Sequence, residues 1–323
     1  MLFRVGWGRM SSFSQIEILV VGPLLPALMD ALESTFQVHK LWALQGAGKG
    51  IATIGGNIRA LVTSFVHGAD AALLESLPNL EMIASYGVGL DRIDLDTVRR
   101  RNLLLTNTPD ISEPVADTAM ALLLAVTRRL CQADSFVKAG RWAKEAFPFG
   151  VELRGKTCGI VGLGRIGRAV ARRAEAFGMK IAYHGPNAKS DAPYPYYRDL
   201  TALAMDSDAL VLALPGGEQT WHLVDERVLS ALGPKGFLIN VARGSVLDEA
   251  ALIRKLKAGE LAGAGLDVFE QEPLGESPLM ELENVVLLPH IGSATTETRH
   301  AMGDTVLANL KAHFSGEKVL TPA

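Results

Sequence analysis

A glycine-rich turn between a predicted strand and a predicted helix constrains the fold of this chain most strongly. The apolar run at 157–161 leads directly into Val-Gly-Leu-Gly-Arg-Ile-Gly at 161–167, and a helical pattern follows. In such a strand–turn–helix unit, Gly162 permits the tight turn, Gly164 lets a pyrophosphate approach the backbone, and Gly167 lets the helix pack on the strand. The free N–H groups at the start of the helix then face the phosphates. The segment therefore predicts a dinucleotide-binding unit.

Short apolar runs alternate with helical patterns along the whole chain. Five runs come first, at 16–22, 38–44, 58–63, 80–86 and 103–106. Six more follow, at 157–161, 180–184, 209–214, 236–241, 262–268 and 284–288. Continuous apolar strands separated by helices are typical of parallel sheets covered on both faces. The pattern predicts an α/β fold with two doubly wound, parallel-sheet (Rossmann-like) domains, and we expect the active site in a cleft between them.

The division into domains follows from the order of these elements. We expect a dinucleotide-binding Rossmann domain over 109–292 and a discontinuous, flavodoxin-like substrate-binding domain over 1–108 and 293–323. A last amphipathic helix at about 295–315 has no strand after it. Such a helix, after a complete series of strands, is predicted to pack back on the first domain.

A long helical pattern separates the two series of strands. It runs from about residue 113 to residue 138, and Ser112 is positioned to cap its N-terminus. Its central part, residues 119–126, is continuously apolar. An apolar stretch of this kind indicates either a core helix or a subunit interface.

The composition excludes several classes of protein. The 323 residues carry 32 Lys and Arg against 35 Asp and Glu, without the basic surplus of a nucleic-acid-binding protein. No apolar run approaches the roughly 18 residues of a membrane helix, and residues 1–10 lack the apolar stretch of a signal peptide, although Met10 is an alternative start. We therefore expect a cytoplasmic protein without membrane or nucleic-acid partners. Cys131 and Cys158 are too few for a disulfide framework or a four-thiolate zinc site, so we expect two small buried residues and no metal.

Polar side chains follow the carboxyl ends of three strands in the second series. Arg243 follows the fourth of the six strands, Asp267 and Glu272 follow the fifth, and His290 follows the sixth. The carboxyl ends of parallel strands meet at one edge of the sheet, where ligands of doubly wound folds bind, so we expect these side chains on one rim. A guanidinium, two carboxylates and an imidazole can bind an anionic substrate and move a proton.

The residues that follow the strand at 180–184 indicate which of the two coenzymes, NAD or NADP, the protein binds. An acidic residue is expected there to hold the ribose hydroxyls of NAD, but no carboxylate lies between His184 and Lys189, and Asp191 comes too late. Without that carboxylate a ribose 2'-phosphate meets no like charge, while Arg165 and Lys189 supply positive charge. The segment favours NADPH, and the alternative is NAD bound without this anchor.

Five ordered motifs resemble those of the D-isomer-specific 2-hydroxyacid dehydrogenases. They are SYGVGLD at 85–91, VGLGRIG at 161–167, NVARGSVLDE at 240–249, GAGLDVFEQEP at 263–273 and LPHIGSAT at 288–295. The resemblance extends from about residue 16 to residue 314. It is closest to the glyoxylate/hydroxypyruvate reductase branch, in which the strand-end acid is also missing.

The resemblance implies a role for most residues of the rim. Arg243 would bind the carboxylate and carbonyl of the substrate, and His290 would protonate the keto oxygen. Glu272 would hydrogen-bond His290 and keep it protonated, because a neighbouring carboxylate favours the imidazolium. The backbone of Val88 and Gly89 would hold the substrate carboxylate. Hydride addition places negative charge on the carbonyl oxygen, which a guanidinium and an imidazolium stabilise.

The resemblance also implies where the coenzyme binds. Asp267 would contact the nicotinamide carboxamide. The expected cofactor-binding residues are Gly162, Gly164, Arg165, Ile166, Gly167, Gly185, Asn187, Lys189, Pro215, Val241, Ala242, Asp267 and Gly292.

These inferences predict an NAD(P)-dependent D-2-hydroxyacid dehydrogenase, and specifically an NADPH-dependent reductase of glyoxylate or hydroxypyruvate. One alternative is an NAD-dependent D-lactate or 3-phosphoglycerate dehydrogenase, against which the missing carboxylate near Gly185 argues. Another is a coenzyme-sensing corepressor or scaffold of the same fold, which no interaction tail supports. We also expect a homodimer, with the helix at 113–138 and the loop of Trp142 at its interface. There Trp142 is either an interface residue or one that reaches into the partner's active site.

Overall fold

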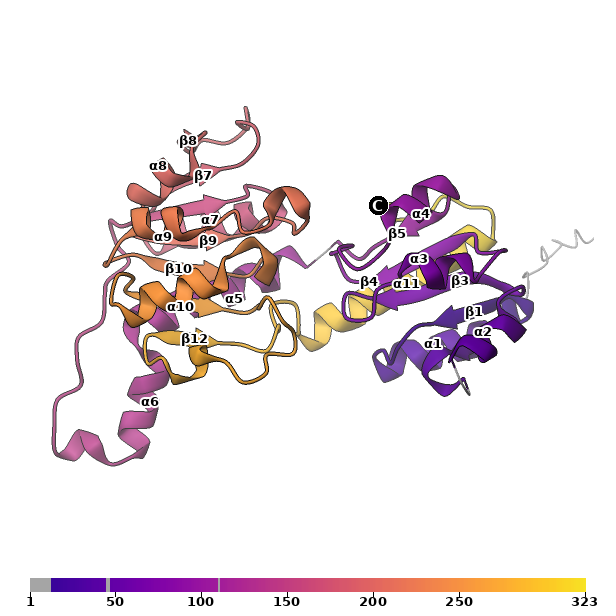
Figure 1. The fold of residues 1–323 in the computed structure, drawn as a ribbon, viewed down its shortest axis with the longest axis horizontal. Helices are drawn as coiled ribbons and strands as arrows, with labels where there is room; N and C mark the ends of the chain where they lie inside the picture. Colours follow the sequence, from indigo (N-terminus) through magenta and orange to yellow (C-terminus); the bar gives the residue numbers. More distant parts are fainter. Residues whose placement is uncertain (1–12, 45–46, 110) are drawn as a thin grey trace, which may run out of the picture. The chain divides into compact units, whose positions relative to one another are not determined.

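The structure is a computed structural model that describes residues 13–44, 47–109 and 111–323. The chain divides into two compact units, Met1–Asp110 with Thr296–Ala323, and Ile111–Thr295. Each unit is a parallel sheet with helices on both faces (Figure 1). The predicted fold class, α/β with two doubly wound parallel sheets, is confirmed. The chain crosses between the units two residues later than expected at the first boundary and three residues later at the second.

The sheet of the first unit has the strand order β2-β1-β3-β4-β5, which is the order of flavodoxin-like sheets. Its strands are β1 (Glu17–Val20), β2 (Gln37–Lys40), β3 (Ile58–Ser64), β4 (Met82–Tyr86) and β5 (Leu104–Thr106). Its helices are α1 (Pro26–Thr35), α2 (Ala47–Ile54), α3 (Ala71–Glu75), α4 (Leu95–Arg100) and α11 (Thr296–Phe314). The last helix contacts β4 and α1 and buries Met302, Val306 and Leu310. The prediction that it packs back on the first part of the chain is therefore confirmed.

The sheet of the second unit has the strand order β12-β11-β10-β9-β6-β7-β8. Its strands are β6 (Thr157–Val161), β7 (Lys180–His184), β8 (Tyr196–Tyr197), β9 (Ala209–Leu212), β10 (Phe237–Asn240), β11 (Gly263–Leu266) and β12 (Val285–Leu287). The short strand β8 was not predicted, because two residues display no periodicity. With β8 included, the six strands from β8 to β11 have the order of a dinucleotide-binding sheet, and β12 is an addition at its edge.

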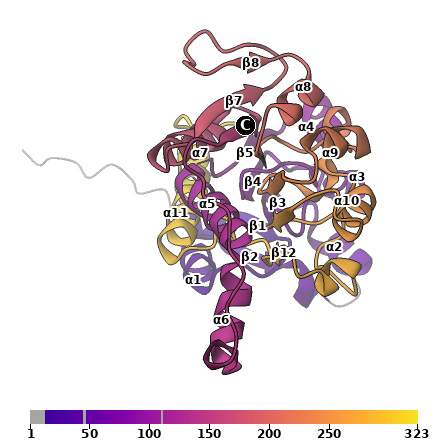
Figure 2. The ribbon, with the colours of Figure 1, turned by 90° about the vertical axis from the view of Figure 1, so that its left-hand side faces the viewer.

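The helices of the second unit lie on both faces of its sheet. They are α5 (Ser112–Arg128), α6 (Leu130–Lys138), α7 (Arg165–Ala176), α8 (Leu200–Met205), α9 (Glu226–Leu232) and α10 (Glu249–Lys257). One hydrophobic cluster joins α5 and α7 to the sheet, and a second joins α8, α9 and α10 to it. Figure 2 shows these two groups on opposite sides of the strands.

The prediction of one continuous helix at 113–138 is wrong. Arg129 has the left-handed conformation (φ 54°), so α5 ends there and α6 begins as a separate helix at Leu130. The predicted cap is also wrong, because Ser112 is the first residue of α5 and the capping position is that of Ile111. Such a break depends on the tertiary environment more than on local propensity.

The apolar run at 119–126 belongs to the core. Its residues Leu122 and Leu123 are buried in the second unit. The strand beneath provides room for the helix through its glycines, since a Cβ atom at Gly265 would lie 2.9 Å from the Cβ atom of Leu122. The buried residues of this run therefore pack in the core, and its place at a subunit interface stays a prediction.

The two cysteines differ in their environment. Cys158 is buried and its thiol pKa is raised by burial to about 12. Cys131 is exposed on α6, so the expectation of two buried cysteines is wrong for it. The residue lies beyond the break at Arg129, where the helix extends away from the sheet (Figure 2). Among the described helices, none combines the length and the apolar character that crossing a membrane requires.

Candidate active site

The glycine-rich turn after β6 has the geometry of a phosphate-binding turn. Gly162 has φ 96°, and a Cβ atom on it would lie 2.7 Å from the carbonyl oxygen of Ala213. A Cβ atom on Gly167 would lie 2.1 Å from the carbonyl oxygen of Gly162. By contrast, no described atom outside the adjoining residues lies within 4 Å of the Cβ position of Gly164.

The three glycines of the turn have two different roles, because two of them allow close packing and the third lies beside open space. Gly162 and Gly167 are required by the contact of turn, strand and helix. Gly164 is the capping residue of α7, and the space beside it is open to a ligand at the N-terminus of that helix. The residues present therefore fit the pyrophosphate of a dinucleotide, with Arg165 exposed and Ile166 half-buried on the first turn.

The loop after β7 is held by tyrosines that the sequence analysis did not single out. The Tyr196 hydroxyl donates to the carbonyl oxygen of Gly185 (3.0 Å), and the amide of Lys189 donates to the Tyr183 hydroxyl (2.7 Å). The side chains of Asn187 and Lys189 are exposed. A Cβ atom on Gly185 would meet no described atom within 4 Å. The loop is thus ordered without filling the space beside Gly185.

The acidic residue nearest to this loop is engaged elsewhere. Asp191 forms an ion pair with Arg168 of α7 (2.8 Å), which lowers the pKa of the carboxyl. The charge of this carboxylate is therefore balanced by a neighbouring guanidinium.

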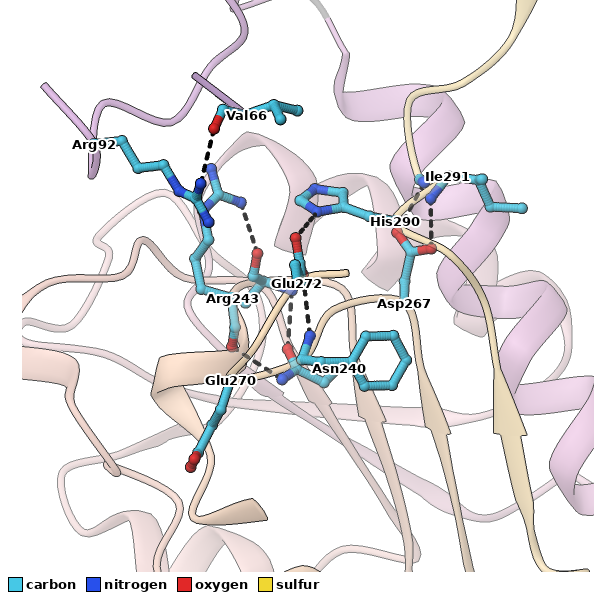
Figure 3. A network of polar contacts seen from close by, with 12 residues as sticks. Val66, Arg92, Asn240, Arg243, Asp267, Glu270, Glu272, His290 and Ile291 are labelled. Carbon is cyan, nitrogen blue, oxygen red and sulfur yellow. Dashed lines mark hydrogen bonds and ion pairs between the residues drawn. The ribbon is translucent and has the colours of Figure 1, made fainter. Parts of the chain in front are cut away.

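The loop that carries Arg243 is fixed by a buried amide at the end of β10. Asn240 is fully buried, and its side chain donates to the carbonyl oxygen of Arg243 (3.0 Å) and accepts from the amide of Ala242 (3.0 Å). The Arg243 guanidinium donates to the carbonyl oxygen of Ala242 (2.7 Å; Figure 3). Asn240 was missed as a functional residue. A polar residue that ends an otherwise apolar strand is the signal that points to it.

The Arg243 loop lies against the loop that carries Glu272. A Cβ atom on Gly244 would lie 1.8 Å from the carbonyl carbon of Phe269 and 2.3 Å from the amide nitrogen of Glu270. Only glycine fits at such a distance between two backbones. The contact fixes the positions of the two loops relative to each other.

Glu272 and His290 form the central contact of the rim. Glu272 Oε2 lies 2.7 Å from His290 Nδ1, and Glu272 Oε1 accepts from the amide of Phe269 (3.0 Å; Figure 3). Burial raises the pKa of Glu272, but the hydrogen bond to His290 and the charge of that imidazole outweigh burial, so the net pKa is lowered. The amide of Phe269 and the charge of Arg243 act in the same direction. The site therefore favours an ionised Glu272 beside His290.

Asp267 organises the backbone on which His290 stands. Its two carboxylate oxygens accept from the amides of Ile291 (2.7 Å) and Gly292 (2.8 Å), and its carbonyl accepts from the amide of His290 (2.9 Å). His290 itself has the left-handed conformation (φ 53°). Burial raises the pKa of Asp267 above its ordinary value, and the two amides offset only part of this effect. A Cβ atom on Gly292 would lie 2.9 Å from Asp267 Oδ2, so this position requires glycine.

The remaining predicted cofactor contacts differ in exposure. Val241 and Ala242 are buried at the end of β10, and their side chains belong to the two hydrophobic clusters. Only their backbone can therefore face a ligand. Pro215 is exposed after β9, and its carbonyl oxygen accepts from the Thr220 hydroxyl (2.9 Å).

Within the first unit, the predicted substrate-binding residues follow β4. The carbonyl of Val88 accepts from the Asn107 side chain (3.2 Å), and the carbonyl of Gly87 accepts from the amide of Thr108 (3.1 Å). These bonds use carbonyl groups only. The amides of Val88 and Gly89 take no part in these bonds, and adjacent backbone amides of this kind suit an anionic ligand.

Three other histidines of the second unit and of α11 contact groups outside the rim. His184 Nδ1 bonds to the carbonyl of Tyr197 (3.0 Å), and His300 Nδ1 bonds to the carbonyl of Thr296 (2.8 Å). His222 pairs with the side chain of Glu270 (2.7 Å), a contact that the sequence does not indicate. Trp142 is 71% exposed. In the part of the chain that is described, no cluster of His, Cys, Asp and Glu is arranged to hold a metal ion.

The chain is similar to known enzymes over nearly its whole length. The sequence model of the D-isomer specific 2-hydroxyacid dehydrogenase NAD binding domain matches residues 120–292. A glyoxylate/hydroxypyruvate reductase of Arabidopsis thaliana is 48% identical over 308 residues, 95% of this chain and 98% of that protein. A hydroxyphenylpyruvate reductase of Plectranthus scutellarioides is 46% identical with the same coverage.

A solved structure is also similar. It is the NADPH-dependent glyoxylate/hydroxypyruvate reductase of Sinorhizobium meliloti in complex with NADP and malonate, with 43% identity and a TM-score of 0.89 over 96% of this chain and 97% of that one. The matched domain includes the glycine-rich turn, Arg243, Glu272 and His290. The chain belongs to the D-isomer specific 2-hydroxyacid dehydrogenase family.

Proposed function

We propose that this protein is an NADPH-dependent reductase that converts glyoxylate or hydroxypyruvate to the corresponding 2-hydroxy acid. The Glu272–His290 pair, 2.7 Å apart on the same sheet edge as Arg243, is the observation that carries the proposal. The relatives named as reductases of glyoxylate and hydroxypyruvate support this substrate class. They do not favour the lactate, phosphoglycerate or corepressor alternatives.

The same observations assign coenzyme binding to one unit and substrate binding to the other. Ile111–Thr295 would be the dinucleotide-binding domain, with the coenzyme along the turn at 162–167 and the strand ends near Asp267 and Gly292. The first unit would be the substrate-binding domain, and the amides of Val88 and Gly89 would bind the substrate carboxylate.

His290 would be the proton donor. Its Nδ1 is hydrogen-bonded to Glu272, so Nε2 is the ring nitrogen that would donate the proton to the keto oxygen. The coenzyme, when bound, supplies the hydride that adds to the keto carbon. As that carbon is reduced, the carbonyl oxygen gains negative charge and then the proton of His290, which yields the hydroxyl group.

Arg243 would bind the substrate and stabilise the same charge. A guanidinium presents several donors in one plane, which suits a carboxylate or an adjacent carbonyl oxygen. Because Asn240 and Gly244 fix the loop of Arg243, the donors are positioned before the substrate arrives. Such preorganisation favours stabilisation of the transition state.

The preference for NADPH rests on the loop after β7. The space beside Gly185 carries no carboxylate, and Asp191 is paired with Arg168. A 2'-phosphate would therefore meet no uncompensated negative charge, and the exposed Lys189 would provide a cation.

The proposed assembly is a homodimer built on α6 and the segment after it. Leu130, Val137 and Trp142 are each at least half exposed, and Phe149 is fully exposed. Exposed apolar side chains so close together in sequence are typical of a subunit interface. Light scattering should give the mass of a dimer at micromolar concentration, and a monomer would reject this part of the proposal.

The function is tested by steady-state kinetics with two coenzymes and two substrates. The purified protein should oxidise NADPH in the presence of glyoxylate or hydroxypyruvate, with a higher kcat/KM for NADPH than for NADH. Turnover with NADH alone would refute the coenzyme assignment. Failure to reduce either keto acid would refute the substrate assignment.

A further inference from the structure

We propose that His222 and Glu270 form a positioning pair, which holds Glu272 against His290 during the reduction proposed above. The inference rests on that proposed function. It concerns a second histidine–glutamate pair, two residues from the first along the Glu272 loop. Neither His222 nor Glu270 is assigned a part in binding or proton transfer.

His222 connects three loops that follow neighbouring strands. It lies after the short helix η4 (Glu218–Thr220), in the loop that follows β9. Its amide donates to the carbonyl oxygen of Ser245 (2.8 Å) in the Arg243 loop, and its Nε2 lies 2.7 Å from Glu270 Oε1 in the Glu272 loop. The backbone of one residue and its side chain therefore hold two different loops.

The imidazole of His222 has a defined orientation. The residue has the left-handed conformation (φ 47°), which non-glycine residues adopt only where surrounding contacts require it. The indole of Trp221 is stacked on the ring, with the centroids 4.5 Å apart and an interplanar angle of 15°. A ring held on its face and through its backbone can direct Nε2 at one acceptor.

Glu270 is held from a second side. Its Oε1 also accepts from the amide of Glu249 (3.2 Å) at the start of α10, and its own amide donates to Glu249 Oε2 (3.2 Å). Its backbone nitrogen is one of the atoms that leave no room for a Cβ atom on Gly244. Side chain and backbone of Glu270 are thus both fixed by neighbouring loops.

The position of Glu270 determines that of Glu272. Only one residue separates them, and the amide of Phe269 donates to Glu272 Oε1 (3.0 Å) within the same turn. When the His222 contact is lost, the turn from Phe269 to Glu272 keeps fewer restraints, and the 2.7 Å contact between Glu272 and His290 becomes less defined. Small displacements of groups that support a proton donor have large effects on rate.

The pair suits positioning better than global stabilisation. The side chains of His222 and Glu270 are 31% and 33% exposed. Ion pairs at this level of exposure contribute little to the free energy of unfolding, because water screens the charges. We therefore expect a change in rate without a comparable change in thermal stability.

Two substitutions at His222 test the hydrogen bond directly. His222→Phe keeps a ring that can stack on Trp221 but removes both ring nitrogens. His222→Gln loses the ring but places a side-chain amide where Nε2 stands. Phe and Gln are both strained at positive φ, and only Gln can bond to Glu270 although only Phe can stack on Trp221, so a higher activity of the Gln variant would be due to the hydrogen bond.

We expect the His222 substitutions to change kcat without a comparable change in the binding constants. His222→Phe should lower kcat by about tenfold, while the KM of the keto acid and the Kd of NADPH stay close to the parent values. Its solvent deuterium isotope effect on kcat should rise, because proton transfer from His290 becomes slower. His222→Gln should recover most of the lost kcat. Both variants should retain the melting temperature of the parent within a few degrees.

A double-mutant cycle provides a second approach to the same pair. Glu270→Leu should lower kcat as His222→Phe does, and the double variant should lose no more than either single variant. Glu226→Gln is the matched control, because it removes an exposed glutamate that is paired with Arg254 in the same unit (2.9 Å). It should leave kcat and the isotope effect unchanged.

Several outcomes would overturn the inference. They are parent-like kcat in His222→Phe, equal losses in the Phe and Gln variants, or fully additive losses in the cycle. Amide hydrogen exchange of Phe269 and Glu270 should be faster in His222→Phe than in the parent, and this readout does not depend on turnover. If the parent reduced no keto acid, the proposed function would fail, and exchange alone would decide whether the pair restrains this turn.

Discussion

Replacing Glu272 by glutamine removes the charge beside His290 and one of the two acceptor oxygens, while it keeps the length of the side chain. The glutamine amide has a single acceptor oxygen, which can accept from His290 Nδ1 in place of Glu272 Oε2, while its NH2 group then faces the amide of Phe269 that Oε1 accepts from in the parent. The two side chains are each 26% exposed, so water screens their interaction only in part. The variant therefore measures what the carboxylate contributes to holding the acid form of His290.

The size of the effect follows from the kind of hydrogen bond that is lost. A hydrogen bond to a charged group contributes about 1.5–3 kcal/mol, and a neutral one contributes about 0.5–1.5 kcal/mol. The charged imidazolium should thus lose about 1–1.5 kcal/mol of stabilisation in the Glu272→Gln variant. One pH unit corresponds to about 1.4 kcal/mol, so the pH at which reduction falls to half should drop by about one unit.

The sign of this shift is fixed by the charges. The proton donor must be protonated for reduction, and Glu272 stabilises the protonated form, so loss of the carboxylate moves the fall in activity to lower pH. The pKa of Glu272 is lowered in the parent, so its carboxylate remains charged below the ordinary range of glutamic acid. Activity at acidic pH should accordingly be retained in the variant.

The assay is the pH dependence of kcat/KM for hydroxypyruvate at saturating NADPH. Glu276→Gln is the control, since it removes an exposed carboxylate from the same loop four residues further on. The control should keep the parent profile. If the fall in activity of Glu272→Gln stays at the pH of the parent, the carboxylate does not tune His290 and the assignment of the pair is wrong.

Two further predictions concern glycines. Gly185→Asp should move the coenzyme preference toward NADH by about tenfold, because the new carboxylate repels a 2'-phosphate. Outside the adjoining residues, no described atom obstructs the added Cβ atom. Unchanged kcat/KM values for both coenzymes would count against the proposed binding mode. Gly244→Ala should destabilise the protein by about 3 kcal/mol or more, since its Cβ atom would lie 1.8 Å from a backbone carbon. Gly275→Ala, where the added atom meets nothing described within 4 Å, should leave the melting temperature unchanged, and equal melting temperatures for both variants would contradict the close contact.

The sequence predicts those parts of the site that depend on the order of strands. The turn at 162–167 and the residues Arg243, Glu272 and His290 follow from strand ends, because parallel strands bring their carboxyl ends to one edge. The doubly wound fold follows from the alternation of apolar runs and helices. These features require only local patterns and a topological rule.

Other features depend on contacts that no local pattern encodes. The left-handed residue Arg129 ends α5 within a continuous helical sequence, and the contact of Gly244 with Phe269 joins two loops that are distant in the sequence. The pairing of His222 with Glu270 joins residues 48 positions apart. Each arises from the tertiary packing of loops, for which the sequence provides residue types but not distances.

The central claim, that His290 donates the proton in keto acid reduction, is tested most directly by His290→Gln. Glutamine keeps the polarity and the approximate size of the side chain but carries no titratable proton. We predict that kcat for hydroxypyruvate reduction falls by about 10²- to 10⁴-fold, while the Kd of NADPH, measured by fluorescence titration, stays nearly unchanged. A variant that reduces hydroxypyruvate at the rate of the parent would contradict the account.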